Sequence, residues 1–532
     1  MNNDLTRMSV SRRSFLSGLG ALGVVAGLGL TGCGSSHSGS GSASGSSDSA
    51  SADGLVIPVS ATVTTLNRDL ESMAEGFLQL KGFATELYIV DGDDTRYYLA
   101  KSCKTDDGLT YTLELRDDLK WHDGEKITAD DVVFTLDCNA ETDNGAGYTN
   151  CVFVGDDPVT YEKVDDLTVK IALPSVSASY FEILGQLVLL PKHAFDGKTD
   201  IKSAKANLKD IGSGPYKLKE FKDGESLSLE AFDDYYEGAP SIKNLTFKVI
   251  GDASAQQVAY KNGEVNLLPV TTETVAKEYR DDKDNTLTSI PEGRVNYLAW
   301  NKYCDTWSNK DAVAAVFKAL SAQEIVDTAY GESLAVVANS IFSNRTLFHS
   351  KGVKAYKQDV DEAKKLAESS GLAGKTIKLY FNADRSYMKE TAQVIQQQLK
   401  AIDVTVDVQG VESNGFFDIV FTDQADYELY LNGYASAGDP DDVVVGMYDG
   451  TWGINVDTPQ EILDLFNQGR ATVDDQERED IYAELQQKAH DANLVYPIAY
   501  PNYCFVAPSN LKGVDTYQTT PIFEDYTKIE FA

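Results

Sequence analysis

The chain has 532 residues, of which 42% are apolar, and it carries a formal net charge of −35 at pH 7. A chain of this length exceeds what one hydrophobic core holds, so roughly two to four domains are expected. The apolar content excludes a disordered chain, and the negative charge excludes nucleic acid and anionic lipid headgroups as partners.

The first 32 residues have the pattern of an export signal. Residues 9–33 are SVSRRSFLSGLGALGVVAGLGLTGC, in which a pair of arginines precedes an apolar stretch from Gly18 to Leu30. This stretch is too short and too rich in glycine to span a bilayer, but it suits the central region of a signal peptide. SRRSFL resembles a twin-arginine export motif, with general secretion as the alternative. We therefore predict a cleaved signal peptide at residues 1–32.

The segment Leu30-Thr31-Gly32-Cys33 resembles the lipobox of bacterial lipoproteins. Small residues before the cleavage site let a peptidase approach the backbone, and the thiolate of Cys33 accepts the lipid. A Ser/Gly run follows and has the composition of a flexible tether. We predict that residues 33–54 form the lipidated cysteine and its tether. The folded body would then lie at the outer face of the cell membrane, in the periplasm or at the cell surface.

Short strands and helices alternate without internal repeats from Leu55 onward. YTLELRDDLKW alternates as a strand does, with Tyr111 and Leu115 on one face. TADDVVFTL then begins a helix, with Thr128 as the N-cap and Asp131 as its reciprocal partner.

The clearest supersecondary pattern spans residues 359–408. Asp359 begins a helix that ends at Gly371, and the strand TIKLYF follows. A second helix buries Met388 and Leu399 at helical spacing, and VTVDV is the next strand. A strand, a helix and a strand of these lengths predict a parallel βαβ unit, and so an α/β fold class.

Five cysteines remain in the folded part, which is an odd number outside the cytoplasm. Cys138 and Cys151 bracket a polar loop, and we consider a local disulfide between them. Cys304 and Cys504 could also meet in space, and the sequence leaves the pairing open.

Motifs for catalysis or metal binding are missing. No two of the histidines of the folded part have the spacing of metal ligands; they are His122, His193, His349 and His490. The sequence has no GxSxG elbow, no HExxH motif and no paired catalytic Cys and His at a recognisable spacing. We therefore expect no enzyme activity, no metal site and no cofactor.

Residues 106–136, DDGLTYTLELRDDLKWHDGEKITADDVVFTL, closely resemble the most recognisable segment of the family 5 extracellular solute-binding proteins of peptide and nickel ABC importers. Further matches follow in the family's order. They are LLPKHAF (189–195), GSGPYKLKEFKDGESLSLEAFDDYYEGAPSIKNLTFKVI (212–250), QQVAYKNGEVNLL (256–268), YLAWN (297–301), DEAKKLAESSG (361–371) and VYPIAYP (495–501).

The resemblance implies a two-lobed α/β fold of the type II periplasmic-binding-protein kind, with an extra subdomain on the first lobe. The expected boundaries are a first lobe of residues 55–80, 197–301 and 497–532, an extra subdomain of residues 81–196 and a second lobe of residues 302–496. The chain would cross between the lobes after AWN and again before YPNY. A monomer that works with the permease of an ABC importer is implied.

The family often binds a ligand ammonium through an Asp in G-W-x-x-D-x-x-D-P. Here Gly433-Tyr434 opens the motif, but the spacing to Asp439-Pro440 is one residue shorter, and Ser436 or Ala437 falls at the amine-binding position. A buried ammonium needs a carboxylate partner. Either Asp439 or Asp441 has moved in to take the amine, or the ligand lacks a free α-amine; we favour the second.

Aromatic and amide side chains supply the other candidates for ligand contact. Aromatic rings offer large contact areas, and an Asn amide pairs with a peptide backbone. The candidates are Tyr434, Trp452, Asn455, Trp300 and Asn301, although Trp300 also suits the core of a hinge.

The sequence thus favours a lipid-anchored receptor for small peptides or peptide-like solutes. A receptor of the same fold for a metal chelate, a haem-like ligand or a glycoside is the main alternative. An extracytoplasmic enzyme or a surface adhesin is the lesser one.

Overall fold

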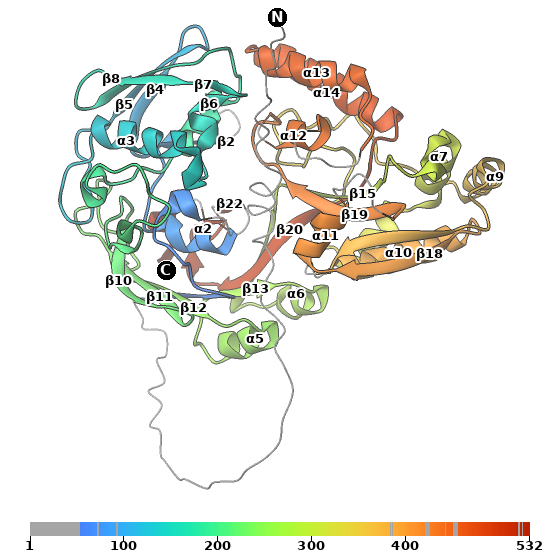
Figure 1. Cartoon of the computed structure of the whole chain (residues 1–532). Coiled ribbons are helices and arrows are strands. Elements are labelled where there is room, and N and C mark those ends of the chain that lie inside the picture. Colours follow the sequence, from blue (N-terminus) through green and yellow to red (C-terminus); the bar gives the residue numbers. More distant parts are fainter. Residues whose placement is uncertain are drawn as a thin grey trace, which may run out of the picture.

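The computed structural model describes residues 54–71, 74–91, 94–383, 385, 387–420, 426–441, 443–450, 456–515, 517–519, 522–523 and 525–532. Two α/β lobes lie side by side, one built mainly from the first half of the described chain and the other mainly from the second half (Figure 1). Cys33, the predicted site of lipidation, lies outside the described residues.

The first lobe is organised around a four-stranded sheet. Its strand order is β1 (Gly54–Val59), β12 (Asn244–Val249), β11 (Ser226–Ala231) and β10 (Tyr216–Lys222). β1 and β12 run parallel, and the other neighbours are antiparallel. Leu55, Ile57, Leu245 and Phe247 are buried in one core with residues of α2 (Ala74–Lys81), as period-two alternation requires.

An extra subdomain has a sheet and a core of its own. The antiparallel strand order is β4 (Ala100–Lys104), β5 (Thr110–Leu115), β9 (Thr168–Ala172) and β8 (Thr160–Lys163). The helices α3 (Ala129–Ala140) and α4 (Tyr180–Gly185) contribute to the same core, whose buried residues fall between Leu87 and Leu189. Thr128 and Asp131 form the predicted capping box at the start of α3.

The second lobe is a sheet between two layers of helices. β15 (Arg294–Trp300), β19 (Leu429–Ala435), β17 (Thr376–Asn382) and β18 (Thr405–Val411) are neighbours in that order. One face packs on α7 (Lys310–Ala319), α8 (Ala322–Ile325), α9 (Val360–Ser370) and α10 (Met388–Lys400). The other packs on α11 (Ser413–Val420), α12 (Val444–Tyr448), α13 (Gln460–Ala471) and α14 (Asp475–Asp491). The predicted parallel unit is confirmed as β17–α10–β18.

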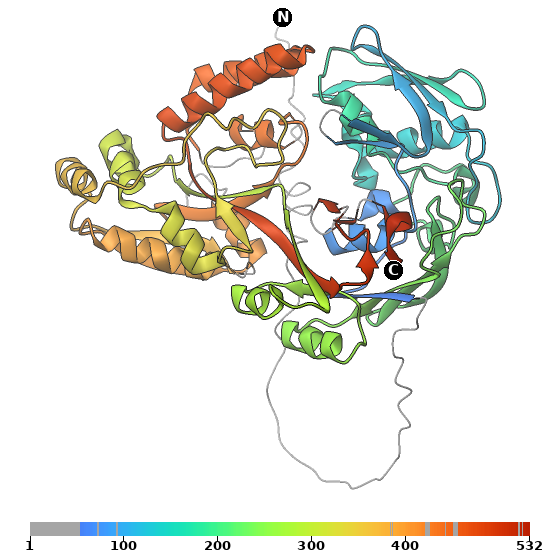
Figure 2. The ribbon, with the colours of Figure 1, turned by 180° about the vertical axis from the view of Figure 1, so that it is seen from behind.

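One long strand, β20 (Tyr496–Pro508), belongs to both lobes (Figure 2). Residues 502–508 pair with β13 (Leu268–Val270) and β14 (Asn285–Pro291), beside α5 (Ala253–Lys261) and α6 (Glu273–Tyr279). Residues 496–501 pair with β15 and with β16 (Ala335–Val337).

The chain crosses between the lobes at Glu292-Gly293, where β14 ends and β15 begins, and Gly293 adopts a φ of 70°. The predicted crossing after residue 301 is too late, because β15 pairs along its whole length with β19 of the second lobe. The return lies inside β20, near Pro501, whose carbonyl accepts a hydrogen bond from the Glu292 N–H at 2.9 Å. An apolar strand such as YLAWN could be buried in the sheet of the first lobe or in that of the second lobe. Its sequence therefore did not indicate which of the two sheets it joins.

Cys138 and Cys151 are free thiols in the structure, so the disulfide considered above is not formed. The reason is their placement in different clusters. Cys138 packs with Phe134 and Phe195, while Cys151 lies in the core of the subdomain. Cys103, Cys304 and Cys504 are also free.

Among the residues that the structure describes, no helix combines the length and the apolar run needed to cross a bilayer.

Asp69 connects the first lobe to the extra subdomain and is 1% exposed. Its Oδ2 accepts a hydrogen bond from Asn139 Nδ2 of α3 at 2.8 Å, and its carbonyl accepts one from the Gly147 N–H at 2.7 Å. Burial raises the pKa of Asp69 from 3.8 to about 7, against the opposing effects of Asn139 and Arg68. The folded chain therefore binds this proton more tightly than the unfolded chain does.

Asp69→Asn should raise the free energy of unfolding, and should do so more at pH 8 than at pH 5. Wild-type stability should fall as the pH rises from about 4 to about 7, because only the unfolded chain ionises Asp69 in that window. The variant should lose this slope and gain about 2 kcal/mol or more at pH 8. Urea unfolding at the two pH values measures it, with the exposed Asp117→Asn as control. An equal effect at both values would contradict the prediction.

Candidate functional site

The loop after β19 begins at the crossing between the lobes. Ser436 N–H donates to the carbonyl of Gly293 at 2.6 Å. The Ser436 carbonyl accepts from Ser343 Oγ at 2.5 Å and from Thr346 Oγ1 at 2.7 Å. These bonds attach the Gly433–Asp441 motif both to the hinge turn and to its own lobe.

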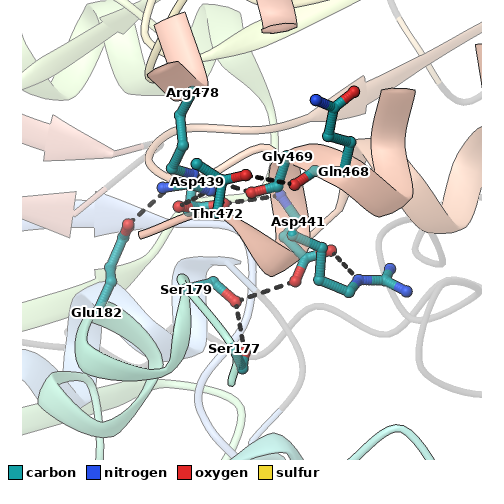
Figure 3. Close-up of polar contacts among 10 residues, drawn as sticks. Ser177, Ser179, Glu182, Asp439, Asp441, Gln468, Gly469, Thr472 and Arg478 are labelled. Atoms are coloured by element: carbon teal, nitrogen blue, oxygen red, sulfur yellow. Dashed lines mark hydrogen bonds and ion pairs between the residues drawn. The ribbon is translucent and has the colours of Figure 1, made fainter. Parts of the chain in front are cut away.

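Asp439 is held inside the second lobe by Arg478 of α14 (Figure 3). Arg478 Nη2 lies 2.7 Å from Asp439 Oδ2 and 3.0 Å from Oδ1, and both side chains are 4% exposed. Burial raises the pKa of Asp439, and the Arg478 guanidinium opposes that shift. The Asp441 N–H also donates to Asp439 Oδ1, at 2.9 Å. The carboxylate is therefore already paired, which argues for a structural role and against binding of a ligand amine.

The second displaced acid, Asp441, is also paired. Its Oδ1 accepts from Arg470 Nε at 2.6 Å, and its Oδ2 accepts from Ser179 Oγ of the extra subdomain at 3.2 Å (Figure 3). Neither acid of the motif has a carboxylate free to receive an ammonium group.

Three of the other candidates lie in the core of the second lobe. Tyr434 is buried, and its hydroxyl donates to the Ile341 carbonyl. Trp300 is buried edge-on against Phe317, with ring centroids 5.7 Å apart. Asn301 Nδ2 donates to the Tyr427 carbonyl at 3.1 Å.

The structure gives Tyr434, Trp300 and Asn301 packing or hydrogen-bonding roles within the second lobe, and their contact with a ligand stays a prediction. Their side chains fill the lobe or tie its turns together. Trp452 and Asn455, the remaining candidates, lie outside the described residues.

A basic cluster lies beside the crossing and was missed from the sequence. Arg294 begins β15, and its Nη1 donates to the Gly433 carbonyl at 3.1 Å while its Nε donates to Glu292 Oε1 at 3.3 Å. Arg385 follows β17 and is half-buried. Burial first, and then the Arg294 guanidinium, lower the pKa of Arg385, while Tyr387 and Glu292 oppose that shift. An anion nearby would therefore stabilise the Arg385 cation.

Tyr387 hydrogen-bonds Arg385 and belongs to a small aromatic and amide group. Asn296 Nδ2 donates to Tyr330 OH at 3.0 Å, and the rings of Tyr330 and Tyr387 stack with centroids 4.7 Å apart. The polar segment that follows the strand TIKLYF, which contains Arg385, was the feature of the sequence that could have indicated this cluster. Ligands of open α/β sheets bind beyond the carboxyl ends of parallel strands, and Arg385 follows the carboxyl end of β17.

Two α/β lobes that share one strand, with a basic and aromatic cluster beside the crossing, define the class of two-lobed solute-binding proteins. Residues 95–455 match the family model of the bacterial extracellular solute-binding proteins, family 5. The chain belongs to that family, whose members are substrate-binding proteins of peptide and nickel ABC transporters and are not enzymes.

Relatives whose names indicate different ligands have similar sequence identity to this chain. The chain is 28% identical to the oligopeptide-binding protein AppA of Bacillus subtilis over 456 residues, which cover 78% of this chain and 80% of that one. It is 26% identical to the nickel-binding protein NikA of Staphylococcus aureus, over 80% of this chain and 83% of that one.

The fold matches a solved structure closely. The ABC transporter substrate-binding protein CtaP of Listeria monocytogenes superposes with a TM-score of 0.84 at 32% identity, over 90% of this chain and 99% of that one. The match confirms the predicted α/β architecture of this class.

No group of three or more His, Cys, Asp or Glu side chains in the described part of the chain is arranged to hold a metal ion.

Asp439→Ala should lower the free energy of unfolding by about 3–5 kcal/mol, because it leaves the Arg478 guanidinium buried without a partner. Denaturant unfolding measures the loss. Asp457→Ala, which removes an exposed carboxylate nearby in sequence, should change stability by less than about 0.5 kcal/mol. Adding Arg478→Met to the first variant should recover part of the loss. Full stability of Asp439→Ala would show that the carboxylate has another role.

Proposed function

We propose that this solute-binding protein captures small peptides or peptide-like solutes between its lobes and delivers them to the permease of an ABC importer. The observation that carries the proposal is the pair of arginines beside the crossing. Burial first, and then the Arg294 guanidinium, lower the pKa of Arg385, and a ligand carboxylate would stabilise the Arg385 cation. The peptide-binding name of the Bacillus subtilis relative supports the same ligand class.

Both described acids of the Gly433–Asp441 motif are paired, and this narrows the class of ligand that we propose. Asp439 and Asp441 are paired within the protein, so a ligand ammonium would find both of these described carboxylates already engaged. We propose that the ligand is anchored through its carboxylate, with Tyr330 and Tyr387 near the anchor point. This arrangement supports a solute without a free α-amine at this loop, as favoured from the sequence.

A metal chelate is the second candidate. The nickel-binding name of the Staphylococcus aureus relative supports it, and a chelator with carboxylate groups would suit the same two arginines. In this case the protein would hold the chelator and contribute no metal ligand of its own. Native mass spectrometry of the purified protein separates the candidates, because a co-purifying peptide and a co-purifying metal complex differ in mass and isotope pattern.

Arg385→Ala should weaken binding of a peptide with a free C-terminal carboxylate about 10- to 100-fold, since a charge-assisted hydrogen bond is lost. Binding of the same peptide with an amidated C-terminus should be weak and should not change. Calorimetric titration of both peptides measures this. Lys389→Ala removes an exposed charge at the start of α10 and serves as the control. Equal affinity of wild type and Arg385→Ala for the free peptide would reject the anchor.

We further propose that a lipid on Cys33 anchors the protein to the outer face of the membrane through the Ser/Gly tether. The lipobox-like segment and the composition of residues 34–52 support this. Cys33→Ser should move the protein from the membrane fraction to the soluble fraction of the producing cells and abolish its labelling by a palmitate analogue. Ser35→Ala in the tether is the control, and membrane retention of Cys33→Ser would contradict the proposal.

A further inference from the structure

The extra subdomain touches the second lobe at a small polar contact. Its α4 and the turn before it approach the loop after β19 and the end of α13 (Figure 3). The two sides are separated by more than 250 positions in the sequence, and nothing in the local pattern of either side predicts the contact.

Glu182 of α4 binds the backbone of the loop. Its Oε2 accepts a hydrogen bond from the Asp439 N–H at 2.9 Å. The approach depends on Gly438, which has a φ of 85°, because a Cβ at this position would lie 1.8 Å from Glu182 Oε1. Glycine is therefore required here both for its backbone conformation and for the space that the carboxylate occupies.

A second set of bonds lies beside the first. Ser179 Oγ donates to Asp441 Oδ2 at 3.2 Å, and the Ala178 N–H donates to the Arg470 carbonyl at 3.4 Å. The same Asp441 carboxylate accepts from Arg470 Nε, so Ser179 binds an acid that is already held in place. A buried ion pair, Asp439–Arg478, fixes the loop on the side away from the subdomain.

The loop after β19 is also hydrogen-bonded to the turn at which the chain crosses between the lobes. Ser436 N–H donates to the carbonyl of Gly293, the residue at which the chain crosses between the lobes. Ser436, which binds the hinge turn, therefore precedes Asp439 and Asp441, which bind the extra subdomain, by three and five positions. Rotation at Gly293 that separates the lobes would break the bonds of Glu182 and Ser179, while β20 keeps the lobes joined.

We propose that Glu182 and Ser179 form a latch with the Gly438–Asp441 loop that holds the lobes closed in the ligand-free protein. The proposal rests on the proposed function only in that the lobes must part to admit a solute. Glu182 accepts a backbone N–H, and Ser179 adds a second hydrogen bond beside it. Two such bonds, present only when the lobes are closed, would shift the equilibrium between open and closed lobes about ten-fold or more toward the closed state. In this chain the acids of the Gly433–Asp441 motif pair with groups of the protein itself.

The test uses the full folded chain freed of co-purifying solute, as checked by native mass spectrometry, and measures lobe separation by small-angle scattering. Wild type should match the scattering calculated for this structure. Glu182→Ala and Gly438→Ala should both shift the profile toward a larger radius of gyration, and Ser179→Ala should shift it less. Glu162→Ala, which removes an exposed carboxylate on β8 of the same subdomain, should leave it unchanged.

Hydrogen exchange supplies a second readout. The Asp439 amide should exchange at least about ten-fold faster in Glu182→Ala, because its acceptor is gone. A wild type with separated lobes, or an unchanged profile and unchanged exchange in Glu182→Ala, would overturn the latch. Neither result bears on the carboxylate anchor, which is measured with ligand by calorimetry, so the two proposals fail independently.

Discussion

Both lobes depend on the continuous hydrogen bonding of one strand, β20. Its first residues complete the sheet of the second lobe, and its last residues complete the pairing of the first lobe with β13 and β14. Backbone groups buried in a sheet must be paired, so neither lobe can release this strand without exposing its own edge. The lobes can therefore rotate apart about the crossing at Gly293, while β20 keeps them joined there.

The acidic and basic side chains near the crossing at Gly293 differ in whether they are already paired. The acids of the Gly433–Asp441 motif are used within the protein, by Arg478 and by Arg470 with Ser179. Near the crossing, burial and the Arg294 guanidinium lower the pKa of Arg385, so its cation gains from an approaching anion. The proposed carboxylate anchor is consistent with this distribution, because a buried ammonium needs a carboxylate partner and these two acids are already paired.

Much of the fold could be predicted from local patterns. The capping box at Thr128, the helix that ends at Gly371 and the parallel unit around α10 follow from contacts between residues close in sequence. The binding motif was found at Gly433-Tyr434, but its shortened spacing raised a question that the pattern did not answer. Ligand contact at Trp300 and Asn301 was expected because they lie near a crossing. In the structure β15 carries Trp300 into the core of the second lobe, and Asn301 donates to the Tyr427 carbonyl just beyond the strand.

The sequence by itself determined the α/β class, the family and the absence of catalytic motifs, since these depend on periodicity and on motif order along the chain. Only the tertiary structure decided where the chain crosses between the lobes and that Cys138 and Cys151 lie in separate clusters. It also decided which arginine forms an ion pair with each aspartate of the motif. Asp439 meets Arg478 across 39 positions and Glu182 across 257 positions. The physical reason is that a carboxylate takes whichever donors folding brings to it, and a local pattern records the acid but not its distant donors.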